Sequence, residues 1–167
     1  GVDRHFKRGL YFSQNQGETF ELVNTSDVHE MVQLPWANHP LIAICEVGHL
    51  RISEDMGKTF KPLEEGLPID EVAMKKKMST SGSAFNALSV GPDFVLLGAR
   101  NGDIYRLNKN ETTWHHVKPT AVNEGSWWGR IQPGKWQHYG KALGSITVSP
   151  VDPDHWYMTD WYAAYQS

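Results

Sequence analysis

The sequence predicts an all-β fold made of β-propeller blades, each with three to four antiparallel strands. A ten-residue pattern ending in Thr-Phe occupies residues 11–20 and recurs at residues 51–60, an offset of 40 residues. Short apolar runs bounded by Gly, Asn or Pro precede the copies, which is the usual signal for strands and hairpins. A period of about 40 residues that contains three or four short strands is typical of a propeller blade.

Each repeat contains three predicted strands before its hairpin pattern. The first strands are expected at 28–34, 84–90 and 145–149, the second at 41–45, 94–98 and 155–159, and the third at 49–53, 103–106 and 162–167. Residues 68–78 are expected to form one or two helical turns in an insertion. The whole chain is therefore interpreted as a single propeller segment, with blades at about 21–60, 61–114 and 115–167.

The hairpin pattern has a physical basis. Residues 53–60 read Ser-x-Asp-x-Gly-x-Thr-Phe, and residues 13–20 match this pattern with Asn15 at the Asp position. Short polar side chains fold such a turn onto its own backbone amides, and glycine supplies the positive φ. The final aromatic residue is expected to pack between sheets. At residues 107–114 the final Thr-Trp remains, so that hairpin is not expected to form the same turn.

This pattern resembles the Asp-box, or bacterial neuraminidase repeat, of sialidase-like β-propellers. The resemblance implies an architectural role at the blade periphery, so Asp55 is not expected to be catalytic. Similar boxes occur in xyloglucan-active two-propeller glycoside hydrolases, in sortilin-type receptors and in photosystem assembly factors. The resemblance therefore implies the fold and leaves several functions open.

Residues 158–167 resemble the T-D-x-G-G-x-Y-R strand of the xyloglucanase-type enzymes, in which the Asp is catalytic. Asp160 matches that Asp, while Tyr-Ala replaces the Gly pair and Gln166 replaces the Arg. The resemblance implies that Asp160 acts as acid or base. Trp161, the next residue, is predicted to contact substrate. Glycosidases usually use two carboxyl groups, and in those enzymes the pair comes from two propellers. The alternative is that Asp160 caps its own hairpin.

A loop insertion at residues 123–140 is rich in aromatic residues. Its Gly and Pro content predicts a loop, and several aromatics in a loop indicate a recognition surface. Sugar rings stack on indole and phenol rings, and basic or amide side chains donate hydrogen bonds to hydroxyl groups. The predicted substrate-binding residues are Trp127, Trp128, Arg130, Trp136, His138 and Tyr139. The alternative is that the tryptophans cover the propeller rim or pack against a neighbouring blade.

Composition limits the possible partners. The 167 residues carry 16 Lys and Arg against 19 Asp and Glu, a net charge of −3, which argues against a general nucleic-acid or anionic-membrane binder. No apolar run reaches the roughly 20 residues that span a bilayer. The single cysteine, Cys45, excludes an intrachain disulfide, and the scattered histidines give no recognisable zinc spacing. Neither a metal nor another cofactor is expected.

These observations predict a carbohydrate-active propeller that binds a polysaccharide or oligosaccharide and hydrolyses its glycosidic bonds. A secreted or periplasmic location is expected, although no signal peptide is visible in the sequence. The alternative is a non-catalytic propeller that holds a protein or a glycan, as sortilin-type receptors or assembly factors do. Three blades would leave open sheet faces and edges. The remaining blades are therefore expected from the rest of a longer chain or from another chain.

Overall fold

The computed structural model describes residues 8–36, 38–45, 48–69, 85–99, 103–117 and 144–159, together with the backbone of residues 164–166. Within these residues the chain forms thirteen strands and no α-helix. Every strand pair is antiparallel and joins strands that are consecutive in sequence. The prediction of an all-β fold of small antiparallel sheets is confirmed.

Four sheets follow one another along the described part of the chain. The first contains β1 (Leu10–Phe12) and β2 (Glu21–Asn24). The second contains β3 (Val28–Gln33), β4 (Leu41–Cys45), β5 (His49–Ser53) and β6 (Lys61–Pro62). The third contains β7 (Phe85–Val90), β8 (Phe94–Ala99), β9 (Ile104–Asn108) and β10 (His115–Val117). The fourth contains β11 (Ser145–Val148), β12 (Trp156–Thr159) and β13 (Ala164–Gln166).

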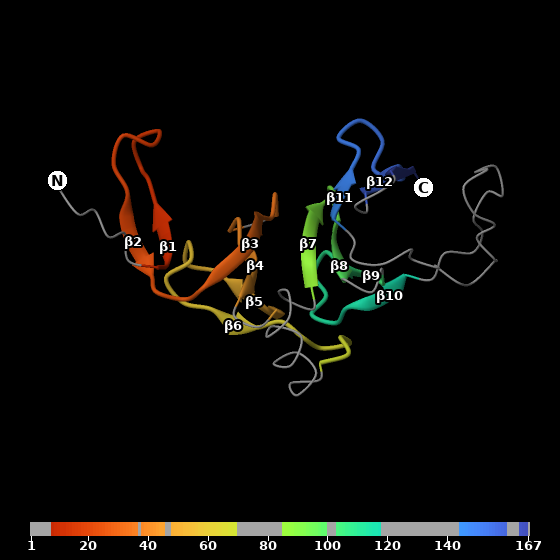
Figure 1. Cartoon of the computed structure of the whole chain (residues 1–167), viewed down its shortest axis with the longest axis horizontal. Coiled ribbons are helices and arrows are strands. Elements are labelled where there is room, and N and C mark those ends of the chain that lie inside the picture. Colours follow the sequence, from red (N-terminus) through yellow and green to blue (C-terminus); the bar gives the residue numbers. More distant parts are fainter. Residues whose placement is uncertain are drawn as a thin grey trace.

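The sheets lie side by side in the order of the sequence, as adjacent blades of a β-propeller do (Figure 1). The first strands of the second, third and fourth sheets form the line of contact, because β7 lies against both β3 and β11. Side chains join these strands across the sheets. Glu30 Oε1 accepts a hydrogen bond from the N–H of Leu88, and Ser89 Oγ accepts one from the N–H of Val148, both at 3.0 Å.

The third sheet is buried on both faces. Successive side chains of a strand point to opposite faces, and β8 is apolar at both sets of positions. Val95 and Leu97 pack into a core shared with the second sheet. Phe94 and Leu96 pack into a core shared with the fourth sheet, where Ile146 is also buried. This arrangement explains why β8 is continuously apolar rather than alternating.

The predicted strands agree with the structure in type and position. The expected strands at 41–45 and 49–53 coincide with β4 and β5, and the expected strand at 94–98 differs from β8 by one residue. Most of the helical turns expected at 68–78 lie outside the described residues. Among the described residues, no helix is long and apolar enough to cross a membrane.

The hairpins at residues 13–20 and 53–60 form the same turn. In both, the serine Oγ accepts a hydrogen bond from the glycine N–H at 2.8 Å. The Oδ1 of Asn15 accepts the N–H of the following threonine at 3.0 Å, and the Oδ1 of Asp55 does so at 2.8 Å. Asn therefore replaces Asp without changing the backbone geometry of the turn.

The glycine and aromatic positions of these hairpins were also predicted. Gly17 and Gly57 have φ values of 91° and 85°, so the predicted positive φ is confirmed. The aromatic position behaves differently between copies. Trp114 is 2% exposed and packs between sheets as expected, whereas Phe20 is 62% exposed within the described part of the chain. The packing prediction is therefore confirmed for the tryptophan and wrong for Phe20.

The third hairpin, at residues 107–114, forms a different turn, as predicted. The N–H of Glu111 donates to the carbonyl oxygen of Asn108 at 3.1 Å, and the Asn108 amide donates to Glu111 Oε2 at 3.1 Å. These bonds replace the serine and aspartate bonds of the other two hairpins. The serine, aspartate and glycine of the pattern are absent from this copy. Lys109 occupies the position that Asp55 holds in the preceding sheet.

Candidate functional site

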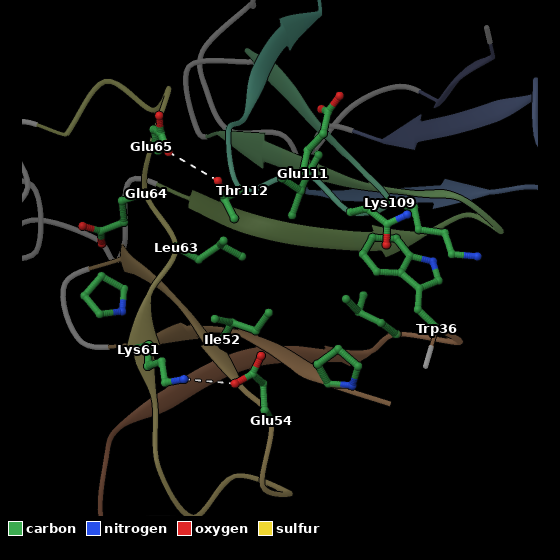
Figure 2. Close-up of a pocket in the computed structure, with 15 residues that line it drawn as sticks. Trp36, Ile52, Glu54, Lys61, Leu63, Glu64, Glu65, Lys109, Glu111 and Thr112 are labelled. Carbon is green, nitrogen blue, oxygen red and sulfur yellow. Dashed lines mark hydrogen bonds and ion pairs between the residues drawn. The ribbon is translucent and has the colours of Figure 1, made fainter. Parts of the chain in front are cut away.

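A groove lies between the second sheet and the β9–β10 hairpin of the third sheet (Figure 2). Its volume is about 640 Å³, within the range of about 300–1,000 Å³ that small-molecule and cofactor sites occupy. Its lining combines an apolar floor with charged and polar side chains at the rim. The lining residues are Leu34, Trp36, Pro40, Ile52, Glu54, Lys61, Pro62, Leu63, Glu64, Glu65, Leu107, Lys109, Asn110, Glu111 and Thr112.

The floor of the groove is the edge of the hydrophobic core. Leu34, Leu63 and Leu107 belong to the core shared by the second and third sheets, and Ile52 packs against it. Figure 2 shows Ile52 and Leu63 in the middle of the groove, between its two charged ends. A ligand that fills the groove would therefore cover apolar surface, which is a favourable contribution to binding.

One end of the groove is formed by Trp36 and Lys109 (Figure 2). Trp36 lies in the loop between β3 and β4, which is closed by a hydrogen bond of 2.9 Å from the Leu34 N–H to the Pro40 carbonyl. Its indole N–H donates to the carbonyl oxygen of Pro92 at 3.0 Å, so the ring is held in place by the third sheet. The groove thus depends on contact between two sheets.

The charged groups at this end and along the rim are paired within the protein. Lys109 Nζ lies 3.6 Å from a carboxylate oxygen of Asp93. Lys61 Nζ lies 3.0 Å from Glu54 Oε2, and both side chains are exposed. Exposed pairs of this kind contribute about 0–1 kcal/mol to stability. Both pairs can therefore be exchanged for contacts with a ligand at little cost to folding.

The other end of the groove is acidic and holds Glu64 and Glu65, while Glu111 lies between this end and Lys109 (Figure 2). Glu64 Oε1 lies 2.7 Å from His49 Nδ1 and also accepts the N–H of Leu50 at 3.2 Å. Glu65 accepts a hydrogen bond of 3.4 Å from the Thr112 hydroxyl. A hydrogen bond from the Asn108 side chain, followed by the contact with His115, lowers the pKa of Glu111. The lowered pKa favours the ionised form of Glu111.

Two further carboxylates, which do not line the groove, have shifted pKa values. Burial raises the pKa of Glu30, as expected of a general acid, but its Oε1 is hydrogen-bonded to the Leu88 N–H and it is not a lining residue of the groove. Hydrogen bonds from Thr59 lower the pKa of Asp55 to about 2. Asp55 is thus an ionised, turn-closing group, which agrees with the predicted architectural role.

The predicted site residues lie outside the described part of the chain. They are Asp160, Trp161, Trp127, Trp128, Arg130, Trp136, His138 and Tyr139. Their roles in substrate binding and catalysis stay predictions. In the part of the chain that the structure describes, no group of three or more His, Cys, Asp or Glu side chains is placed to hold a metal ion.

The groove itself was not predicted from the sequence. Two signals could have drawn attention to it. Trp36 lies in a short segment flanked by Pro35 and Pro40, which marks a loop that carries an aromatic residue. Lys109 and Glu111 replace the Asp and Gly of the hairpin pattern, so the third copy lost the residues of the turn and acquired charged ones.

Among the comparisons with known proteins, the comparison with solved structures gives matches. No family model matches the sequence, and no curated protein matches it. Seven chains of solved structures match. One of them is titled "YCF48 bound to D1 peptide", with a TM-score of 0.46 and 15% sequence identity over 82% of the present chain. The match covers 39% of that structure's chain, so the present chain spans less than half of its length.

Proposed function

We propose that the protein is a non-catalytic β-propeller scaffold that binds a partner protein in the groove between its second and third sheets. The observation that carries this proposal is the groove itself. The groove has an apolar floor and a charged rim. Sites that recognise a partner by both its shape and its charge combine these two features. Adjacent sheets supply its two walls, so the fold holds the groove open without a ligand.

The chemistry of the carboxylates supports a binding role over hydrolysis. Glycosidases need one carboxyl group that donates a proton and a second that acts as base or nucleophile. In the groove, Glu54 is paired with Lys61, and Glu64 is bound to His49 and to a backbone N–H. The lowered pKa of Glu111 disfavours a protonated acid at that position. We therefore assign these carboxylates to recognition and to structure.

We also propose that the repeated hairpins are Asp-boxes with an architectural role. The Ser-to-Gly and Asp-to-Thr hydrogen bonds close each turn on itself, which leaves the acidic side chain occupied. The scaffold proposal does not need these side chains to contact a ligand. It is also compatible with Asn15 at the acidic position of the first hairpin.

Site-specific photocrosslinking in the cells that make the protein tests the scaffold proposal. A benzoyl-phenylalanine at Glu54 places the reactive group at the groove rim, and one at the exposed Glu21 of β2 serves as the matched control. The expected result is a light-dependent adduct with a protein at Glu54 that is absent at Glu21. The same adducts at both positions, or none at Glu54, would contradict the proposal.

A second candidate function rests on the sequence of residues 123–140 and on Asp160. The aromatic insertion would stack sugar rings, and Asp160 would act as acid or base in glycoside hydrolysis. The intact protein should be incubated with a panel of polysaccharides, and released oligosaccharides should be measured for the wild type and for Asp160→Ala. Release that stops in the variant would establish hydrolysis and overturn the non-catalytic assignment. Release that survives in the variant would reject Asp160 as the catalytic residue.

A further inference from the structure

Three glutamates of the groove have no lysine or arginine partner among the described residues. The lining contains four glutamates and two lysines, and both lysines already contact carboxylates, Glu54 and Asp93. Among the described residues, Glu64, Glu65 and Glu111 form no ion pair with Lys or Arg; their contacts are histidine, threonine, asparagine and backbone groups. Within the described part of the chain, the carboxylates that line the groove therefore outnumber its lysines.

The negative charge adjoins apolar surface. Figure 2 shows Leu63 beside Glu64 and Glu65, and Ile52 next to Leu63 in the central part of the groove, near the paired Glu54 and Lys61. Lys and Arg side chains combine an apolar stem with a charged head, and they lay the stem on apolar surface while the head reaches polar groups. A basic side chain is thus complementary to this floor and rim, whereas an acidic one would meet like charge at the same end.

The sheet edge beside the groove favours recognition through side chains. A bound strand needs a row of N–H and C=O groups on an exposed edge. The edge strand β6 is only two residues long, and its second residue, Pro62, has no N–H to donate. This edge is therefore a poor template for strand addition, and a ligand would be selected by the groove's charges and apolar floor.

We propose that the groove binds an extended segment of the partner protein in which basic residues alternate with leucine-like apolar residues. This inference rests on the proposed scaffold function and adds the chemistry of the ligand. The apolar side chains lie on Leu63 and Ile52, and the basic heads reach Glu65 and Glu111. The segment extends as far as Trp36, where the paired lysine offers no partner to a further basic residue.

The test uses two capped hexapeptides, one alternating Leu and Arg and one alternating Leu and Glu, added to the ¹⁵N-labelled 167-residue chain. The readout is the indole N–H resonance of Trp36, which lies in the groove and is held by the Pro92 carbonyl. The Leu-Arg peptide is expected to shift this resonance in a saturable manner that weakens with added salt. The Leu-Glu peptide is expected to bind more weakly.

Variants identify the groups that select the charge. The double substitution Glu65→Gln and Glu111→Gln keeps the size and the hydrogen-bonding oxygen of both side chains. It is expected to weaken binding of the Leu-Arg peptide by roughly fivefold, because each exposed ion pair makes only a small contribution to binding. The matched control is Glu21→Gln on β2, outside the groove, which is expected to leave binding unchanged.

The outcomes separate this inference from the scaffold proposal. Equal binding of both peptides, or an equal loss in the control variant, would overturn the basic-segment inference while leaving a peptide-binding groove. Absence of any Trp36 shift, together with a groove-specific photocrosslink at Glu54, would also overturn the inference and keep the scaffold. Absence of both the shift and the crosslink would reject the inference and the scaffold together.

Discussion

The indole N–H of Trp114 donates a hydrogen bond of 2.9 Å to the carbonyl oxygen of Leu63. The backbone N–H of the same tryptophan donates to the Glu65 carbonyl at 2.8 Å. One residue at the end of the third hairpin thus joins the third sheet to the segment that follows β6. That segment also lines the groove, so Trp114 fixes the distance between the groove's two walls.

Trp114→Ala is expected to lower the free energy of unfolding by about 3–5 kcal/mol, because a buried indole is removed and a cavity remains. Trp114→Phe keeps most of the buried area and leaves the Leu63 carbonyl without its donor, so a smaller loss of about 1–3 kcal/mol is expected. Urea denaturation measures both. Phe20→Ala is the control, since Phe20 is exposed and its removal should change stability little. Equal losses at Trp114 and Phe20 would contradict the role of burial.

Ser53→Ala is expected to destabilise the protein more than Ser13→Ala. Both hydroxyl groups accept the glycine N–H of their hairpin at 2.8 Å, but Ser53 is buried whereas Ser13 is only half-buried. Water can replace a lost partner at a half-exposed site, while a buried N–H left unpaired costs about 1–3 kcal/mol. Urea denaturation of the two variants measures the difference. A loss at Ser13 as large as that at Ser53 would contradict this explanation.

Asp55→Asn is expected to preserve the second hairpin, because Asn15 already forms the same turn in the first. The hydrogen bonds from Thr59 hold the pKa of Asp55 at about 2, below its usual value of 3.8. A carboxylate with a lowered pKa stabilises the folded state above the unfolded pKa, and this contribution is lost as the pH falls towards the folded pKa. Stability should therefore fall between about pH 5 and pH 2.5 in the wild type by more than in Asp55→Asn. Parallel pH profiles of the two proteins in urea denaturation would contradict the prediction.

Glu30→Gln is expected to stabilise the protein near neutral pH. Burial raises the pKa of Glu30 in the folded state, although the Leu88 N–H opposes the shift. Ionisation is then easier in the unfolded chain, so the folded state loses stability as the pH rises from the unfolded pKa through the folded one. Glutamine still offers an oxygen to Leu88 and carries no charge. The stability gained by the variant should shrink as the pH falls towards about 4, as measured by urea denaturation at several pH values. A gain that is independent of pH would point to packing rather than ionisation.

Strand positions could be predicted because burial leaves a local record in the sequence. The run that forms β8 is apolar at every position and is bounded by the charged residues Asp93 and Arg100, so its length and burial follow from residues that are neighbours in the chain. The turns at 13–20 and 53–60 follow in the same way from short polar residues and glycine. These features depend on contacts within a few residues or within one hairpin.

The groove could not be predicted because its parts are distant in the sequence. Trp36 and Lys109 lie more than seventy residues apart, and they meet only because the second and third sheets pack face to face. Trp36 belongs to no recognisable motif, and Lys109 lies in the copy of the hairpin pattern that has lost its serine, aspartate and glycine. A periodic pattern shows which residues face a core, but it does not show which loops of two neighbouring sheets come together at their rim.

The burial of β8 on both faces has a consequence for the integrity of the protein. Residues 94–99 form an uncharged, proline-free six-residue segment, the composition that favours intermolecular β-aggregation when such a segment is exposed. The second and fourth sheets shield it from either side. Any condition that detaches one of these sheets would expose a self-associating surface, so the neighbours of the third sheet protect the protein from aggregation as well as completing its core.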